Sequence, residues 1–96
     1  MFLSYCIINC IIIYKNRDQE YIIATGGEDR DIKLWHYSTG EFIRGMSGHL
    51  EAITSLAKIR RKELLISAAE DKYIKLWNYN TGRCLKTLQG HTNIIK

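Results

Sequence analysis

The sequence predicts an all-β fold made of two four-stranded antiparallel meanders. Two observations predict it. The chain repeats itself at a fixed offset of 42 residues, and periods of about 40 to 45 residues are those of four-stranded propeller blades. Within each repeat, short segments of alternating apolar and polar residues follow one another across short turns, as in a meander. We therefore expect two blades of an incomplete β-propeller.

The repeat consists of identical residues at corresponding positions. A match at one offset over so long a stretch is very unlikely to arise by chance. The corresponding stretches are Glu28-Asp29 and Glu70-Asp71, Ile32–Trp35 and Ile74–Trp77, Thr39-Gly40 and Thr81-Gly82, and Gly48-His49 and Gly90-His91.

Each repeat contains four segments with strand character. Ile74 and Leu76 alternate with Lys75, which places the two apolar side chains on one face of a strand. Asn80 and Gly82 favour a tight turn before the next segment. The expected strands lie near residues 9–14, 21–25, 31–36 and 41–46 in the first repeat, and near 53–59, 64–67, 73–77 and 84–88 in the second.

The expected organisation follows from these segments. Residues 9–47 form the first blade, residues 48–89 the second, and residues 90–96 begin a third repeat that is unfinished. Residues 1–8 are an apolar segment, which we interpret as a strand or as the product of a wrongly assigned start. The uncharged run to Tyr14 is too short for a membrane-spanning helix and lacks the features of a signal peptide. No membrane association is expected.

The charge and the cysteines of the chain argue against several kinds of binding site. Lys and Arg number 14 against 10 Asp and Glu, so the chain is only mildly basic. The three cysteines, Cys6, Cys10 and Cys84, fit no disulfide framework, and reduced thiols in the cytoplasm are the simplest interpretation. No paired CxxC motif is present, so we expect no metal site and no cofactor.

These motifs resemble the WD-repeat family (Trp-Asp repeat, G-protein β-subunit-like). Its blades carry a Gly-His pair, a small-residue turn, an Asp and a strand that ends in Trp-Asp. The stretch from Gly48 to Trp77 matches best, although His36 and Asn78 follow the two tryptophans where the family often has Asp. The resemblance implies a buried structural tetrad in the second blade, formed by His49, Ser67, Asp71 and Trp77.

The first repeat carries only part of that tetrad, namely Thr25, Asp29 and Trp35. The residue 42 positions before His49 is Ile7, so we expect this tetrad to be incomplete. Each of these residue types recurs at a fixed offset, and a single active site has no reason to do this. We therefore predict that the tetrad is structural, that no residue is catalytic and that the protein is not an enzyme.

The resemblance implies a platform that binds other proteins or peptides. Candidate binding residues on the face formed by the turns are Glu28, Arg30, Leu50, Glu51, Glu70 and Lys72. A propeller needs four to eight blades to close. The chain is therefore expected to be part of a larger propeller, a truncated non-functional gene product, or a unit that self-associates to complete a ring.

A nucleic-acid-binding surface is the alternative function. Its candidate residues are Lys58, Arg60, Arg61 and Lys62. Charged residues are normal in turns between strands, so a solvated turn is the favoured interpretation of this group. Binding that weakens steeply with salt would distinguish the alternative.

Overall fold

The computed structural model describes residues 7–89, and within this range it contains eight strands and no helix. No helix there is long and apolar enough to span a membrane. The predicted segment 90–96 and most of the predicted segment 1–8 lie outside the described residues. The strands are β1 (Ile8–Lys15), β2 (Tyr21–Gly27), β3 (Ile32–His36), β4 (Phe42–Met46), β5 (Ile53–Lys58), β6 (Leu64–Ala69), β7 (Tyr73–Asn78) and β8 (Arg83–Gln89).

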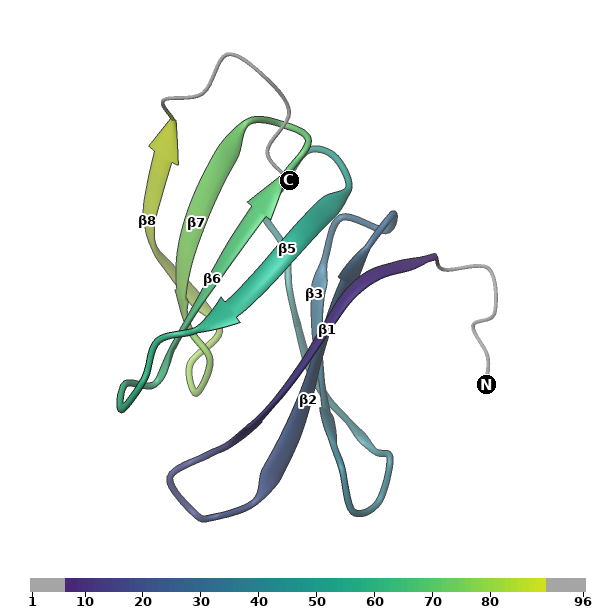
Figure 1. Ribbon diagram of the computed structural model, residues 1–96, viewed down its shortest axis with the longest axis vertical. Helices are drawn as coiled ribbons and strands as arrows, with labels where there is room; N and C mark the ends of the chain where they lie inside the picture. Colours follow the sequence, from purple (N-terminus) through teal and green to yellow (C-terminus); the bar gives the residue numbers. More distant parts are fainter. Residues whose placement is uncertain (1–6, 90–96) are drawn as a thin grey trace.

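The strands form two separate four-stranded antiparallel sheets, in the orders β1-β2-β3-β4 and β5-β6-β7-β8 (Figure 1). Each strand pairs with its neighbour in sequence, so both sheets are simple meanders. The predictions of an all-β fold and of two four-stranded blades are therefore confirmed. The turns between β2 and β3 and between β6 and β7 lie at one end of the blades, and the β1–β2 and β5–β6 turns lie at the other.

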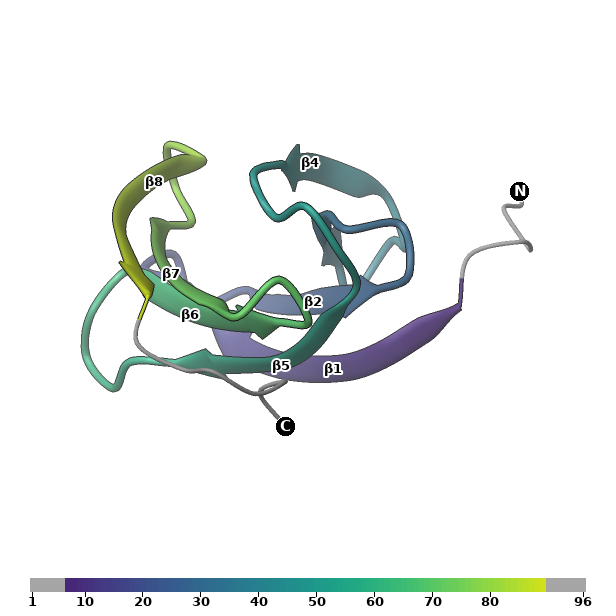
Figure 2. The same cartoon turned by 90° about the horizontal axis from the view of Figure 1, so that it is seen from above.

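The two sheets meet along their first strands. β1 and β5 lie side by side where the sheets come together, whereas β4 and β8 lie at the far ends of the two sheets (Figure 2). Burial of apolar side chains between the sheets is the main favourable contribution to this packing. The shared core contains Tyr14, Ile22, Ala24, Ile32, Leu34, Met46, Ile53, Leu65, Ala69, Trp77 and Tyr79.

The two blades bury opposite faces. Leu34 is buried against the second blade, whereas Leu76, its counterpart 42 residues later, is only partly buried. On the other face the order is reversed, because Trp77 is 1% exposed and Trp35 is partly exposed. The first contrast recurs between Ile22 and Leu64, Ala24 and Ile66, and Ile32 and Ile74. The face that is buried in one blade therefore corresponds to the face that is exposed in the other.

Candidate functional site

The structure brings His49, Ser67, Asp71 and Trp77 together in the second blade. The Nδ1 atom of His49 lies 3.0 Å from Asp71 Oδ2, and its Nε2 atom lies 2.6 Å from Ser67 Oγ. The indole N–H of Trp77 donates to the same Ser67 hydroxyl over 2.8 Å. A carboxylate can only accept, so Nδ1 carries the proton, and in the neutral imidazole Nε2 accepts from Ser67.

Asp71 fixes two segments of backbone as well as the imidazole. Its Oδ2 accepts from the N–H of Leu50 over 2.9 Å, and its Oδ1 accepts from the N–H of Tyr73 over 2.9 Å. Burial alone raises the pKa of the Asp71 carboxyl, but the hydrogen bonds from Leu50, Tyr73 and His49 outweigh it and hold the pKa below its ordinary value. This carboxylate is therefore ionised and satisfied at neutral pH.

The residue before the imidazole shows why the motif begins with glycine. A Cβ atom on Gly48 would lie 3.1 Å from the Trp77 ring and 3.5 Å from the Lys75 side chain. A larger residue would press on the indole that the network holds in place.

The burial of this network explains what it can do chemically. His49, Ser67 and Asp71 are the residue types of a hydrolytic triad, but Ser67 is 0% exposed and its oxygen already accepts from Trp77. A nucleophile has to reach a substrate carbonyl, and this hydroxyl has no path to one. The geometry therefore supports a role in holding β6, β7 and the turn before β5 together.

The corresponding residues of the first blade are arranged differently. The indole N–H of Trp35 donates to Thr25 Oγ1 over 3.3 Å, a longer bond than that of Trp77. Asp29 pairs with the ammonium of Lys33 over 2.7 Å, in place of an imidazole. The sequence did not indicate this pairing, because both repeats have a lysine four residues after the aspartate. In the second blade that lysine, Lys75, donates to Thr87 instead.

A cavity of about 230 Å³ lies beside Trp35, on the open face of the first blade. Thr25, Asp29 and Lys33 line it together with Ile7 and Ile8 from the chain before and at the start of β1. At the matching place in the second blade, Trp77 is buried in the core cluster that the two blades share, and the chain that leads into β5 lies against its ring. The incomplete network is therefore also the less covered one.

The strand register corrects one expectation about this site. Glu28 donates its N–H to the carbonyl of Ile7, and Glu70 donates to that of Ala52, each over 2.9 Å. Ile7 is therefore the counterpart of Ala52 and not of His49.

The reason for the shift is the length of the first turn. Ile13 pairs with Ile23 and Lys58 pairs with Leu65, so the first blade has three more residues between these paired positions. The offset is 45 residues between β1 and β5, although it stays at 42 for the later strands. The position matching His49 is Ser4, which lies outside the described residues.

Five of the six candidate binding residues line one depression between the blades. Its volume is about 330 Å³, and its walls come from the β2–β3 turn, the chain before β5 and the β6–β7 turn. Lys72 is exposed but does not line the depression. The lining residues are Glu28, Arg30, Leu50, Glu51, Ala52 and Glu70, so three carboxylates face a single cation.

Two of the turns at this end have unusual backbone geometry. Arg30 and Lys72 each have a φ of 73°, a left-handed conformation that costs a residue with a Cβ roughly 1 kcal/mol. They are at corresponding positions, so the two blades use the same turn. Each turn presents the carboxylate two residues before it, Glu28 or Glu70, at the depression.

No group of His, Cys, Asp and Glu suited to holding a metal ion is found within residues 7–89. Cys10 is partly buried in β1 and Cys84 is exposed on β8, and neither is in a disulfide there.

A model of one known protein family matches both repeats of this chain. The model of the WD40 family, described as WD domain, G-beta repeat, matches residues 4–36 and 40–78. The second match includes β4 together with β5, β6 and β7. The family's sequence unit is therefore offset from the structural blade by one strand.

Curated proteins with similar sequences are much longer than the stretches that match this chain. Mitochondrial division protein 1 of Candida glabrata is 43% identical over 49 residues, which are 51% of this chain and 7% of that protein. Human striatin is 44% identical over 54 residues, which are 56% of this chain and 6% of striatin. The chain thus spans less than a tenth of the length of these relatives.

Solved structures give the same relationship. The structure of U3-55K superposes with a TM-score of 0.75 and 26% sequence identity, over 85% of this chain and 25% of that one. The crystal structure of the RRP9 WD40 repeats superposes equally well, over 24% of its chain. With the family match, the two meander blades and the His-Ser-Asp-Trp network in agreement, the chain belongs to the WD40 (WD domain, G-beta repeat) family.

Proposed function

We propose that this chain is part of a protein-interaction platform, and that the depression between its blades binds a basic segment of a partner protein. The observation that carries the proposal is the convergence of Glu28, Glu51 and Glu70 around one depression, where Arg30 is the only cation that residues 7–89 contribute to the lining. This local excess of negative charge stands against a chain whose net charge is +4. Complementary charge guides encounter and selects partners.

The positions of these residues support a binding role over a role in folding. Glu28, Leu50 and Glu51 are exposed, so the core does not depend on their side chains. The backbone beneath them is held firmly, because Asp71 binds the N–H of Leu50 and Ala52 accepts from Glu70. Exposed side chains on a rigid support are typical of recognition surfaces.

We also infer that the chain works as part of a larger propeller. The inference is supported by the two open blade faces, one beside Trp35 and one over Leu64, Leu76 and their neighbours. Contiguous apolar surface of this kind is normally covered by another blade. WD40 proteins generally act through binding and not through catalysis, and the depression contains polar and charged groups suited to contact with a peptide.

A cytoplasmic location is part of the proposal. It is supported by Cys10 and Cys84, which are free thiols in the structure. Localisation of a tagged protein in cells would test it, and secretion would contradict it.

Binding of a labelled peptide rich in Lys and Arg tests the platform. We expect binding that weakens with salt and that falls about tenfold in the double variant Glu28→Lys, Glu51→Lys. Glu41→Lys is the matched control, because Glu41 is exposed in the β3–β4 turn at the other end of the blade. Equal losses in both proteins, or no binding by the unmodified chain, would reject the proposal.

A further inference from the structure

Two adjoining cavities lie at the end of the blades opposite the acidic depression. The larger one, of about 310 Å³, is lined from both blades and contains Lys15, Arg17, Lys58, Arg61 and Lys62. The smaller one, of about 100 Å³, reaches into the interface between the blades, and we call it the inner cavity. Asn16 and Tyr79 line both cavities, so the two adjoin, and we call them together the basic groove.

The basic groove has an excess of positive charge, and one of its cations is held in a fixed position. Among the described residues, Glu63 is the only carboxylate in the lining of either cavity, and Arg17 already pairs with it over 2.7 Å. The ammonium of Lys58 donates to the carbonyls of Ile59 and Lys62, which fixes its position. A fixed charge loses little side-chain entropy on binding an anion. Lys15, Arg61 and Lys62 are exposed, and the ammonium of Lys15 lies 5.4 Å from the centre of the Tyr21 ring.

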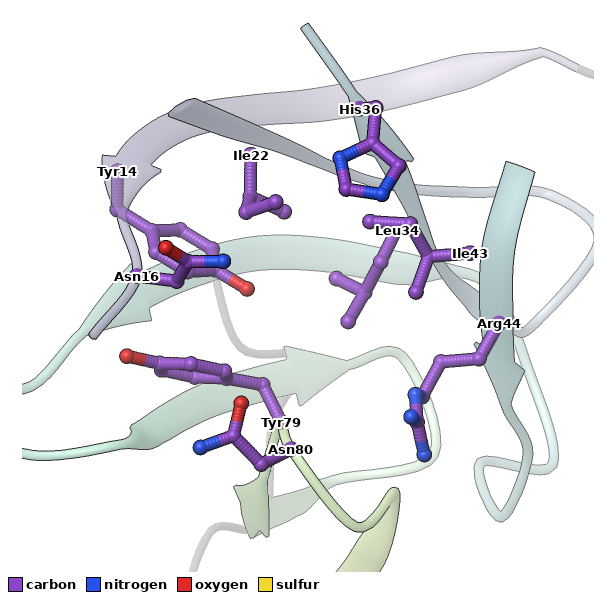
Figure 3. A pocket seen from close by; sticks show the side chains of 9 residues that line it. All are labelled: Tyr14, Asn16, Ile22, Leu34, His36, Ile43, Arg44, Tyr79 and Asn80. Carbon is purple, nitrogen blue, oxygen red and sulfur yellow. The ribbon is translucent and has the colours of Figure 1, made fainter. Parts of the chain in front are cut away.

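The inner cavity contains two buried donors that the described protein does not satisfy. The hydroxyl of Tyr14, a residue only 6% exposed, has no hydrogen-bond partner among the described residues, and neither does the buried Nε atom of Arg44. Figure 3 shows the Tyr14 hydroxyl pointing into the group of lining side chains, with Arg44 reaching in from β4. Buried donors without a partner cost about 1 to 3 kcal/mol each, so an acceptor that reached them would bind favourably.

The inner cavity also has an apolar wall, beside the further polar side chains of Asn16, His36 and Asn80. Ile22, Leu34 and Ile43 line it opposite the polar groups. A short methylene stem that ends in a carboxylate matches this combination of an apolar wall, a single guanidinium and a phenolic donor. The guanidinium of Arg44 balances one negative charge, as a side-chain carboxylate supplies.

We propose that the basic groove binds an acidic peptide segment, with one Glu or Asp side chain entering the inner cavity toward Tyr14 and Arg44. Neighbouring acidic residues of the same segment lie along Lys15, Arg61 and Lys62. This site is separate from the acidic depression and does not depend on it.

A single-stranded nucleic acid fits the groove less well. Its binding normally relies on aromatic side chains on which bases stack. His36 contributes a partly buried imidazole to the inner cavity. The tyrosine rings of the groove are those of Tyr14 and Tyr79, which are buried and packed on each other with centroids 4.6 Å apart. Their faces are therefore not available to a base.

Fluorescence anisotropy of the full chain tests the proposal. The probes are a labelled peptide with a run of glutamates and an oligothymidine of equal charge. We expect the peptide to bind more tightly than the oligothymidine. Tyr14→Phe and Arg44→Gln should each weaken peptide binding about five- to tenfold. Arg83→Gln is the matched control, because Arg83 is exposed on β8 and lines neither cavity. It should change the affinity less than twofold.

A urea titration separates binding from folding. Tyr14→Phe removes a hydroxyl that has no partner in the described protein, so the urea midpoint should not fall. Unchanged peptide affinity in this variant would overturn the proposal, whether or not its stability changed. Oligothymidine binding as tight as peptide binding would also overturn it, and so would the absence of any peptide binding. The variants Glu28→Lys and Glu51→Lys should bind the acidic peptide normally, which keeps this result independent of the acidic depression.

Discussion

The indole N–H of Trp77 donates to the Ser67 hydroxyl over 2.8 Å, and both residues are almost completely buried. The hydroxyl also lies 2.6 Å from His49, so one oxygen links β6, β7 and the chain that enters β5. In the first blade the indole of Trp35 has a similar partner, Thr25, but no imidazole follows. The two blades therefore contain a complete and an incomplete version of the same network, so matched substitutions in the two blades should have unequal effects.

Replacing the carboxylate should affect the two blades unequally. Asp71→Ala removes the acceptor for Leu50, Tyr73 and His49 and should lower the free energy of unfolding by about 3 kcal/mol. Asp29→Ala removes a partly exposed ion pair with Lys33 and should cost about 1 kcal/mol or less. Urea midpoints of both variants decide the matter. Equal losses would count against a structural role for the tetrad.

The two tryptophans should differ in stability and in fluorescence. Trp77→Ala empties a fully buried site and should cost about 3 to 5 kcal/mol, whereas Trp35→Ala should cost less because that ring is partly exposed. In Trp35→Phe, the remaining Trp77 should emit at short wavelength. In Trp77→Phe, Trp35 should emit at longer wavelength. A water-exposed emission from Trp77 would contradict the burial of this network.

Stability should fall in acid partly through Asp71. Its pKa is lower in the folded chain than its ordinary value of 3.8. The unfolded chain therefore takes up this proton first as the pH falls below about 4, which costs up to about 1.4 kcal/mol per pH unit until the folded form is protonated too. The advantage of the unmodified chain over Asp71→Asn should be constant above pH 5 and shrink toward pH 3. Urea midpoints across this range measure it, and a constant advantage would be inconsistent with the lowered pKa.

Replacing Lys72 with glycine should stabilise the folded chain. The φ of 73° there strains any residue with a Cβ, so Lys72→Gly should raise the free energy of unfolding by about 0.5 to 1 kcal/mol. Lys62→Gly is the control, because Lys62 does not have a positive φ and should lose stability through the greater freedom of the unfolded chain. Thermal melts of the two variants should shift in opposite directions.

The isolated chain should not be a stable monomer. Two broad blade faces are open, and β8, which is exposed throughout, is a sheet edge with unpaired backbone groups. Size-exclusion chromatography with light scattering should detect larger species or a partly unfolded chain. A sharply melting monomer of 11.2 kDa would show that two blades are sufficient.

Much of the fold could be predicted because its information is local. Alternation of apolar and polar residues and the 42-residue repeat gave the strands and their antiparallel order, since each strand pairs with its neighbour in the sequence. The offset of the first strand could not be obtained in this way. Three extra residues in the β1–β2 turn moved the position matching His49 from Ile7 to Ser4, and the backbone pairing of β1 reveals the change.

The candidate sites were predictable to different degrees. Glu28 and Glu70, and likewise Arg30 and Lys72, could be named because they are at corresponding positions of the two repeats, whereas Leu50 and Glu51 could be named because they directly follow the Gly-His pair. The inner cavity of the basic groove could not, because Tyr14 and Arg44 are on strands of the first blade that give no sign of facing Tyr79 of the second. Its contacts depend on how the sheets pack, and no pattern within one repeat encodes this.

The opposite burial of the two blade faces also restricts the symmetry of any assembly. The first blade packs through the face that contains Leu34, and the second blade packs through the opposite face, which contains Trp77. Because these two surfaces differ, two copies of the chain that repeat this packing cannot be related by a twofold axis. They must join head to tail, with the Leu76 face of one against the Trp35 face of the next. Such contacts either close into a ring or continue without limit. Additional blades that close the circle would therefore also protect the protein from growing into fibres.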